Sequence, residues 1–289
     1  MSSLAEVAPT SSPSQEASIQ NAQIQWGKSL PFLGVHLTCL AAFWTGVSWK
    51  AAGLCLTMYV IRMFGITGAY HRYFSHRSYK TSRWFQFVLA WIGCSAMQKG
   101  PLWWAAHHRH HHQHSDQPDD VHSPRQRGFW WAHLGWVLSE RYNPTNFSAV
   151  KDLEKYPELR WLNHWSSVPG IVLAAGCLLA MGWQGLIWGF FISSVMVYHA
   201  TFIINSLCHV FGKARYKTAD TSRNSLILAI ITLGEGWHNN HHFYATSART
   251  GFFWWEIDLS YYALRVFAFF GLVWDLKQPS PRVYTAGVQ

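Results

Sequence analysis

Charge is scarce in this chain of 289 residues. Asp, Glu, Lys and Arg make up 13% of it, about half of their usual share in soluble proteins. Aromatic residues make up 17%, and 18 of them are tryptophans. Few charges combined with many Trp and Tyr residues are typical of proteins that meet the boundary between lipid and water. A soluble helical protein would have to bury its long uncharged stretches completely, so a membrane protein is favoured.

Three further features are missing. The five cysteines are widely spaced and form no CxxC pair, which indicates buried thiols rather than a disulfide framework. Residues 1–25 contain no apolar core and therefore no signal peptide, and we expect a disordered leader over residues 1–28. The net charge of +9 comes without a cluster of Lys and Arg. We therefore expect no nucleic-acid partner, and a surface that suits anionic lipids or acidic proteins.

Long uncharged runs are present instead. Residues 29–49 contain no charged side chain, residues 51–70 contain only Arg62, and residues 161–212 form 52 consecutive positions without one. Because about 20 apolar residues span a bilayer, we predict four spans in two hairpins, near 29–49, 51–70, 166–182 and 185–205. The turn of the second hairpin is expected at residues 182–185. Residues 84–98 form a shorter apolar run, expected along the membrane interface or against the bundle.

The basic residues predict an orientation. Residues 71–160 contain twelve Lys and Arg, and eight more follow residue 205, whereas the opposite connections contain only Lys50. The positive-inside rule then places both termini and the middle segment in the cytoplasm. The predicted fold is an all-α, multi-pass membrane protein. Its embedded domain covers residues 29–275, with a cytoplasmic helical cap from residues 71–165 and 206–275, followed by a tail at 276–289.

Seventeen histidines are present, and nine of them follow patterns. The spacing HxxHH occurs twice, and it places three imidazoles on one side of a helix within about a turn. Another pair is spaced by five residues, which requires the helix to distort or each His to serve a different metal. An Asn and a His spaced by four follow the fourth predicted span. These candidate metal ligands are His71, His76, His108, His111, His112, Asn205, His209, His238, His241 and His242.

Nine imidazoles exceed what one ion can bind, so the count favours two metal ions. All four elements fall on the predicted cytoplasmic side, where they can converge on one site. Imidazole suits Fe, Zn, Cu and Ni, and the ligand type alone does not select among them. A redox metal would permit oxygen activation, whereas zinc would permit hydrolysis or a structural role.

At these residues the chain resembles the membrane fatty-acyl desaturases, in particular the delta-9, stearoyl-type branch without a fused cytochrome b5. The matching strings are HRYFSH at 71–76, HRHHH at 108–112, NSLCH at 205–209 and GEGWHNNHH at 234–242. The resemblance implies four spans with a cytoplasmic cap and two Fe²⁺ ions held by nine His and a water-bridging Asn. It also implies that O2 and two electrons are used to introduce a cis double bond into a saturated acyl chain.

The resemblance leaves the partners open. Animal acyl-CoA members carry an Arg–Asp pair before the second box, but this chain has Ala106 and His107 there. A CoA thioester, a carrier-protein thioester and a lipid-linked chain all stay open as substrates. Electrons are expected from a separate donor such as ferredoxin or cytochrome b5, attracted by the basic cytoplasmic face. The competing interpretations are a membrane di-iron hydroxylase or related oxygenase and a non-enzymatic metal carrier.

Several other polar residues have two interpretations each. Glu235, Asp116 and Asp120 could orient ligand imidazoles, although a solvated loop charge is the preferred interpretation for Asp116. His122 either approaches a metal or packs, and Arg62 either reaches the membrane surface or faces the bundle near a substrate head group. The remaining histidines are expected on the surface, or in packing and capping roles with a hydrogen-bond partner: His36, His107, His110, His114, His133, His164 and His199.

Overall fold

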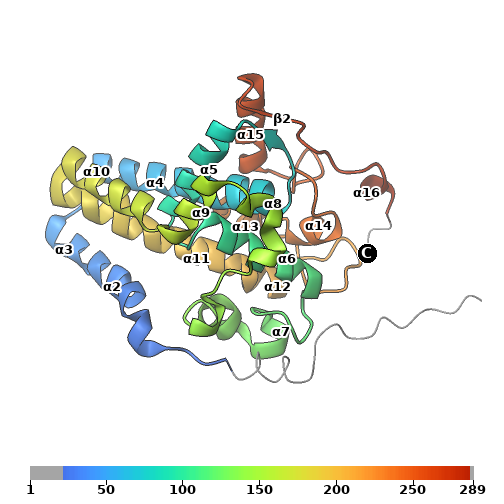
Figure 1. The fold of residues 1–289 in the computed structure, drawn as a ribbon, viewed down its shortest axis with the longest axis horizontal. Helices are drawn as coiled ribbons and strands as arrows, with labels where there is room; N and C mark the ends of the chain where they lie inside the picture. The colour runs from blue at the N-terminus through green and yellow to red at the C-terminus, as the bar shows by residue number, and fades with distance from the viewer. Residues whose placement is uncertain (1–21, 287–289) are drawn as a thin grey trace, which may run out of the picture.

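The structure, a computed structural model, describes residues 22–286 and is mostly helical (Figure 1). The more apolar helices and their connections are η1 (Trp26–Ser29), α2 (Leu30–Thr38), η2 (Cys39–Ala41), α3 (Ala42–Thr45), α4 (Trp49–Phe64), η3 (Gly65–Ser75), α5 (Arg83–Ser95), α10 (Val168–Gly185), η7 (Leu186–Ile192) and α11 (Ser193–Asn205). The others are α6 (Pro101–His114), α7 (Pro124–Arg127), η4 (Trp131–Gly135), η5 (Glu140–Tyr142), η6 (Phe147–Val150), α8 (Lys151–Glu154), α9 (Pro157–His164), α12 (Leu207–Val210), α13 (Leu226–Ile231), α14 (His238–Phe243), α15 (Leu259–Phe269) and α16 (Arg282–Thr285). Strands β1 (Lys80–Thr81) and β2 (Val273–Trp274) pair antiparallel.

Two stretches are long and apolar enough to cross a membrane, Trp49–Ser75 and Val168–Val210, and Leu30–Thr45 is a shorter apolar one. The second stretch has two arms. Met181 and Gly182 leave helical geometry, with φ of +60° at Gly182, and the chain reverses there (Figure 1). Glycine adopts this backbone conformation without a steric penalty. The turn therefore begins at the predicted glycine, and α10 packs back along η7.

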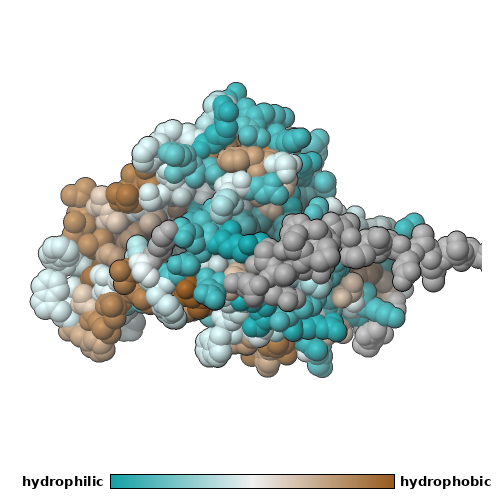
Figure 2. Space-filling view, turned by 60° about the horizontal axis from the view of Figure 1, so that its bottom comes forward, coloured by the Kyte–Doolittle hydropathy of each residue, from teal (hydrophilic) through white to brown (hydrophobic). Residues whose placement is uncertain are grey.

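Apolar side chains gather at one end of the molecule. Figure 2 shows them over the end that holds α3 and the turn at Gly182, while hydrophilic residues cover most of the other end. Phe43, Trp49 and Leu179 are 91%, 94% and 87% exposed. An apolar surface of this kind is unfavourable in water and is expected where lipid covers it. The described fold is therefore that of a membrane protein with a polar cap.

The main core lies between these two ends. It joins residues of α4, η3, α5, α6 and α9, including the fully buried Met63, Leu89, Leu102 and Leu162. The apolar run at residues 84–98 forms α5, which packs against α4, η3 and α10 as one of the two predicted alternatives. The five cysteines are free, and four of them are buried, as predicted.

The chain before α2 is packed where the structure describes it. Ala22 is buried against Trp103 and Trp136, and its carbonyl accepts a hydrogen bond from Arg127. The backbone N–H of Gln25 donates to Leu138. Residues 1–21 of the predicted disordered leader lie outside the described residues. At the other end, Val283 of α16 packs on the cap against Tyr216.

Candidate metal centre

A π-helix carries the first pair of candidate ligands. η3 continues α4 with hydrogen bonds between residues five apart, as in the bond from the His76 N–H to the His71 carbonyl. This repeat places His71 and His76 above one another, which a regular α-helix would not do. Their rings lie 4.8 Å apart. The predicted distortion is confirmed, and the two side chains face the same group of histidines.

The two HxxHH boxes lie on α6 and α14, and each divides in the same way. In α6, His108 and His112 join His71 and His76, whereas His111 points to a second group. In α14, His238 and His242 join that second group, and His241 returns to the first. On a helix, positions i and i+4 diverge by only about 40°, whereas i+3 and i+4 diverge by about 100°. Each box therefore supplies two imidazoles to one group and one to the other.

Two clusters result. Cluster A contains His71, His76, His108, His112 and His241, and cluster B contains His111, His209, His238 and His242. Within each cluster, one ring nitrogen of every histidine lies within 4.8 Å of the others. The nine predicted histidines are all present in these clusters, and they come from η3, α6, α12 and α14.

The distances within the clusters fit metal coordination. In cluster A, the Nε2 atom of His241 lies 3.0 Å from that of His71 and 2.9 Å from that of His112. In cluster B, the Nε2 atoms of His238 and His209 are 3.1 Å apart. Two nitrogens bound at right angles to one ion, at about 2.1 Å each, would be about 3.0 Å apart.

The hydrogen bonds of two cluster B histidines also fit a bound metal ion. The Nδ1 atoms of His111 and His242 donate to Asp120 at 3.1 Å and to Asp220 at 2.6 Å. When neutral, each ring then presents a lone pair on Nε2. Both Nε2 atoms are buried without a hydrogen-bond partner. Because an unsatisfied buried nitrogen is costly, converging lone pairs of this kind fit a bound cation.

Carboxylates also lie beside the Nδ1 atoms of two further candidate ligands, on the side of each ring away from the cluster. Glu235 lies 2.9 Å from Nδ1 of His71, and Asp116 lies 3.6 Å from Nδ1 of His209. Outer partners of this kind fix the ring orientation of metal-bound histidines. Arg72 anchors Glu235 through Nε and Nη2 at 3.0 and 2.9 Å, and Asp258 holds Arg72 from the other side at 2.9 Å.

Burial controls the protonation of the clusters. It lowers the pKa of His108, His112, His238 and His241 well below the ordinary value, with neighbouring histidines adding to the effect. Burial also lowers the pKa of His242 to about 4, against the opposing effect of Asp220. Neutral imidazoles are the form that binds metals.

His111 and the carboxylates behave differently. Burial opposes protonation of His111, but the Asp120 carboxylate outweighs it and raises the pKa. Metal binding in cluster B therefore competes with protonation of His111. Burial by itself would raise the pKa of Asp220, yet the hydrogen bond and charge of His242 hold it well below the ordinary value.

The preferred interpretation of Asp116 was wrong. Its side chain is buried, and it accepts hydrogen bonds from the Thr221 N–H and hydroxyl at 2.7 and 2.6 Å while facing His209. Sequence reasoning missed Asp220, which is 22 positions away from its partner His242. No spacing rule connects them, because a loop between α12 and α13 brings them together.

The comparisons with known proteins agree on one family. A fatty acid desaturase family model matches residues 47–274, which include all nine clustered histidines. The chain belongs to the fatty acid desaturase family. It is 38% identical over 260 residues to an sn-1 stearoyl-lipid 9-desaturase of Anabaena variabilis, covering 88% of this chain and 94% of that one.

Plant relatives extend the range of named substrates. The desaturase is 40% identical over 261 residues to delta-9 acyl-lipid desaturase 1 of Arabidopsis thaliana, covering 88% and 83% of the two chains. It is 37% identical over 251 residues to an acyl-CoA 5-desaturase of Anemone leveillei, covering 86% and 78%. The chain is thus an oxidoreductase of the fatty-acyl desaturase type, and the hydroxylase alternative is not favoured.

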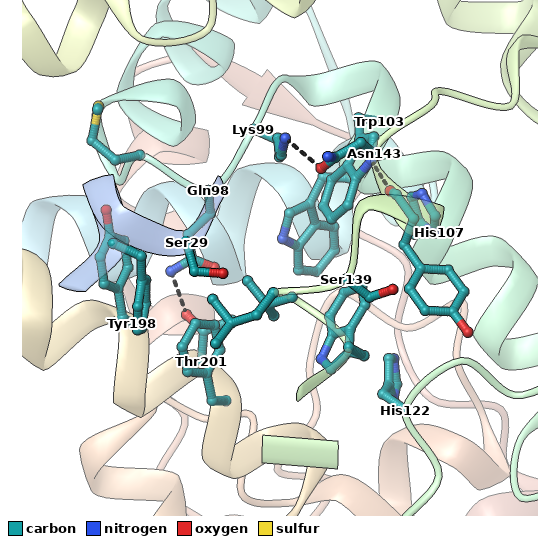
Figure 3. Close-up of a pocket in the computed structure, with 18 of the residues that line it drawn as sticks. Ser29, Gln98, Lys99, Trp103, His107, His122, Ser139, Asn143, Tyr198 and Thr201 are labelled. Atoms are coloured by element: carbon teal, nitrogen blue, oxygen red, sulfur yellow. Dashed lines mark hydrogen bonds between the residues drawn. The ribbon is translucent and has the colours of Figure 1, made fainter. Parts of the chain in front are cut away.

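The desaturase has a cavity of about 360 Å³ (Figure 3), and its lining includes one histidine of cluster A. His108 and Asn205 belong to its lining, and Phe32, Tyr198 and Phe202 give it apolar walls. Gln98 donates to Thr201 at 3.0 Å across one wall, and Lys99 donates to Asn143 at 2.9 Å. Asn205, the tenth candidate ligand, therefore faces the same space as a cluster A histidine.

The structure shows the surroundings of His122 and Arg62, each of which has two interpretations from the sequence of the desaturase. His122 is buried beside the cavity, with its ring 4.3 Å from that of His111 and its Nδ1 3.7 Å from Asp120. Burial lowers its pKa to about 3. Arg62 is fully buried in the bundle, where it donates to Ser193, to Ser194 at 2.8 Å and to backbone carbonyls. The interpretation in which Arg62 reaches the membrane surface was wrong.

Three of the other histidines have hydrogen-bond partners, whereas the buried Nε2 atom of His107 has none within the described residues. His36 contacts His199 at 3.2 Å, His199 contacts His133 at 3.0 Å, and His133 contacts Ser206 at 3.0 Å. This row ties α2 to α11 and η4. His199 uses both of its ring nitrogens in the row, so the three imidazoles do not converge on one point. The row therefore satisfies the hydrogen bonding of polar groups in an apolar setting, as expected.

Proposed function

We propose that the desaturase introduces a cis double bond, at the delta-9 position, into a saturated fatty-acyl chain. One observation carries the proposal: a largely apolar cavity is lined by Asn205 and by His108, a histidine of cluster A. A flexible acyl chain needs such a narrow apolar space so that one carbon pair is held in place and water is excluded. The named activities of the relatives support the reaction and the position.

The proposed cofactor is a pair of Fe²⁺ ions, one in each cluster. The nine histidines supply the nitrogens, and Asn205 acts through a bridging water or directly. When bound, the irons supply the oxidising chemistry with O2 and two electrons. The chain's own part is to hold the rings: Glu235, Asp120 and Asp220 accept from the outer nitrogens and keep the inner nitrogens aimed at the metals.

The proposed setting is a multi-pass membrane domain over residues 29–275, with four spans in two hairpins. A leader over residues 1–28 and a tail over residues 276–289 flank it. The turn at Gly182 supports the second hairpin, and the distribution of Lys and Arg supports a cytoplasmic centre and cytoplasmic termini. Electrons are proposed to come from a separate protein such as ferredoxin or cytochrome b5. The acyl group is carried as a CoA thioester or within a lipid.

Expression of the chain in a host with a compatible reductase tests this function. Mass spectrometry of the host lipids should show a new monounsaturated chain with its double bond at carbon 9. A His241→Ala variant of equal abundance should give none. A hydroxylated product would contradict the proposal, and so would full activity in the variant.

A further inference from the structure

A second opening leads to the clusters from the polar side. A cavity of about 380 Å³ is lined by His112 of cluster A and His242 of cluster B. Most of the rest of its lining is polar, with Gln113, Gln117 and Lys217 among the contributors, and only Ala219 and Phe243 are apolar. Binding of an acyl chain in such a lining would be unfavourable, because the polar groups would lose their contact with water and gain no hydrogen bond in return. The centre is thus reached through an apolar cavity at His108 and a polar one at His112 and His242.

The loop over residues 211–224 is basic, and its residues 217–220 form one wall of the polar opening. It contains Lys213, Arg215, Lys217 and Arg223 but only Asp220 as an acid. Asp220 already pairs with His242 at 2.6 Å, and Arg215 forms an ion pair with Glu256 at 2.6 Å. Lys213 and Lys217 are exposed. Within residues 22–286, neither ammonium group is part of an ion pair.

This loop is held rigidly against the helix that carries the third histidine box. Asn239 of α14 accepts the backbone N–H groups of Arg215 and Tyr216, each at 2.7 Å. Tyr216 stacks on Phe243 with ring centres 4.2 Å apart. The backbone that carries the lysines is therefore held in place relative to His238 and His242, so a partner that binds this loop is positioned relative to the centre.

We infer that the loop over residues 211–224 is the docking surface for an acidic, one-electron carrier protein, whose redox group faces the opening at His112 and His242. The inference rests on the proposed function. Each turnover needs two electrons: –CH2–CH2– + O2 + 2 e⁻ + 2 H⁺ gives –CH=CH– + 2 H2O, and two reduced carriers are each oxidised by one electron. Electron transfer slows steeply with distance, so a carrier gains by docking where ligand imidazoles line an open cavity.

Attraction between the loop lysines and an acidic carrier should make the binding affinity depend on the salt concentration. Surface lysines steer an acidic partner over about one Debye length, which is about 10 Å at 0.1 M salt. Charge pairs at the rim of an interface mainly affect association and its salt dependence. Reversal of Lys213 and Lys217 should therefore weaken carrier binding at low salt and have little effect at high salt.

The test measures binding, not turnover, so that its failure is distinct from failure of the proposed reaction. The protein is placed in lipid nanodiscs, and its affinity for oxidised ferredoxin and for the soluble haem domain of cytochrome b5 is measured at about 50 and 500 mM salt. The variant K213E/K217E is compared with K151E/K155E, which makes the same charge change on exposed lysines of α8 and its end. Equal iron content in the three proteins verifies folding.

We expect at least one carrier to bind the wild type, with affinity falling as salt rises. K213E/K217E should bind it about tenfold more weakly at low salt, K151E/K155E should stay within about twofold, and the difference should vanish at high salt. Absence of binding by both carriers would overturn the inference. An unchanged affinity in K213E/K217E would also overturn it, as would an equal loss in both variants, which would indicate net charge rather than this surface.

Discussion

At the scale of single residues, the site depends on the atoms behind the ligands as much as on the ligands. Asp220 is the clearest example, because its carboxylate fixes the proton of His242 on Nδ1 and leaves Nε2 free. Its loss would let the ring rotate and change tautomer. Outer partners of this kind are typically worth 10- to 100-fold in metal affinity.

An Asp220→Asn variant tests this role. Iron affinity should fall by about 10-fold or more, because the amide accepts a weaker hydrogen bond and can also present its donor side to the ring. Iron content is measured by elemental analysis after dialysis against a graded chelator. Asp275→Asn is the matched control, since Asp275 pairs with Lys80 on the surface, with both side chains exposed. Equal iron retention in the two variants would contradict the assignment of Asp220.

Protonation gives a second prediction at this scale. The pKa of His108, His112, His238 and His241 is lowered by burial in the folded protein. As the pH falls below their ordinary value of 6.5, the unfolded chain takes up protons that the folded chain does not. Each such histidine then removes up to about 1.4 kcal/mol of stability per pH unit.

The metal-free protein in detergent should therefore melt at a progressively lower temperature as the pH is reduced below about 6.5. The carboxylates with lowered pKa act in the same direction at still lower pH. Melting temperatures followed by intrinsic tryptophan fluorescence between pH 7.5 and 5.5 provide the measurement. A constant or rising melting temperature over this range would show that the clusters are not buried as described.

At the scale of elements, the sequence predicted which histidines meet but not how they divide. The HxxHH spacing predicted one common helix face, whereas α6 and α14 each direct two imidazoles to one cluster and the third to the other. The division of each box between clusters A and B follows from helix geometry, yet it also requires two helices to approach from opposite sides. The interval of five between His71 and His76 predicted a distortion, and the π-helix η3 is that distortion.

Contacts between distant loops could not be predicted. The sequence favours a solvated Asp116, because none of the residues near it in the sequence indicates that Thr221, 105 positions away, donates to it. Arg72 has the same character: its partners Glu235 and Asp258 come from the other end of the chain. Such pairs depend on tertiary packing, which leaves no periodic trace in one sequence.

The close packing before α14 gives a prediction for an element. A Cβ atom on Gly236 would lie 2.1 Å from the backbone nitrogen of Ala229 in α13, so the two segments would have to separate. Gly236→Ala should displace His238, lower stability by about 1–3 kcal/mol and reduce iron binding. The control is Gly176→Ala, where nothing lies within 4 Å. Thermal melting and iron content are measured for both, and equal values would contradict the expected strain.

At the scale of the whole molecule, apolar side chains gather at one end and hydrophilic ones cover most of the other (Figure 2). The sequence anticipated this division from its uncharged runs and from the positions of its basic residues. The helix that begins at Leu30 is interrupted by η2 and is shorter than the predicted span. Uncharged composition shows where a span is possible, but local backbone breaks depend on packing.

The orientation gives a prediction at this scale. In intact cells, a membrane-impermeant maleimide should label a cysteine placed at Lys50 but not one placed at Lys151. After the membrane is opened, both should react. These positions lie at opposite ends of the proposed spans, and both are exposed. Labelling of Lys151→Cys in intact cells would place the cap outside and contradict the positive-inside assignment.

The central claim is that two irons, held in clusters A and B, desaturate an acyl chain. Its most direct test is an anaerobic Fe²⁺ titration of the metal-free protein, followed by addition of acyl substrate, reductant and O2 and by mass spectrometry of the product. The product should be monounsaturated, should increase up to two irons per chain and should be absent with Zn²⁺. Full activity at one iron per chain, or a hydroxylated product, would contradict the account.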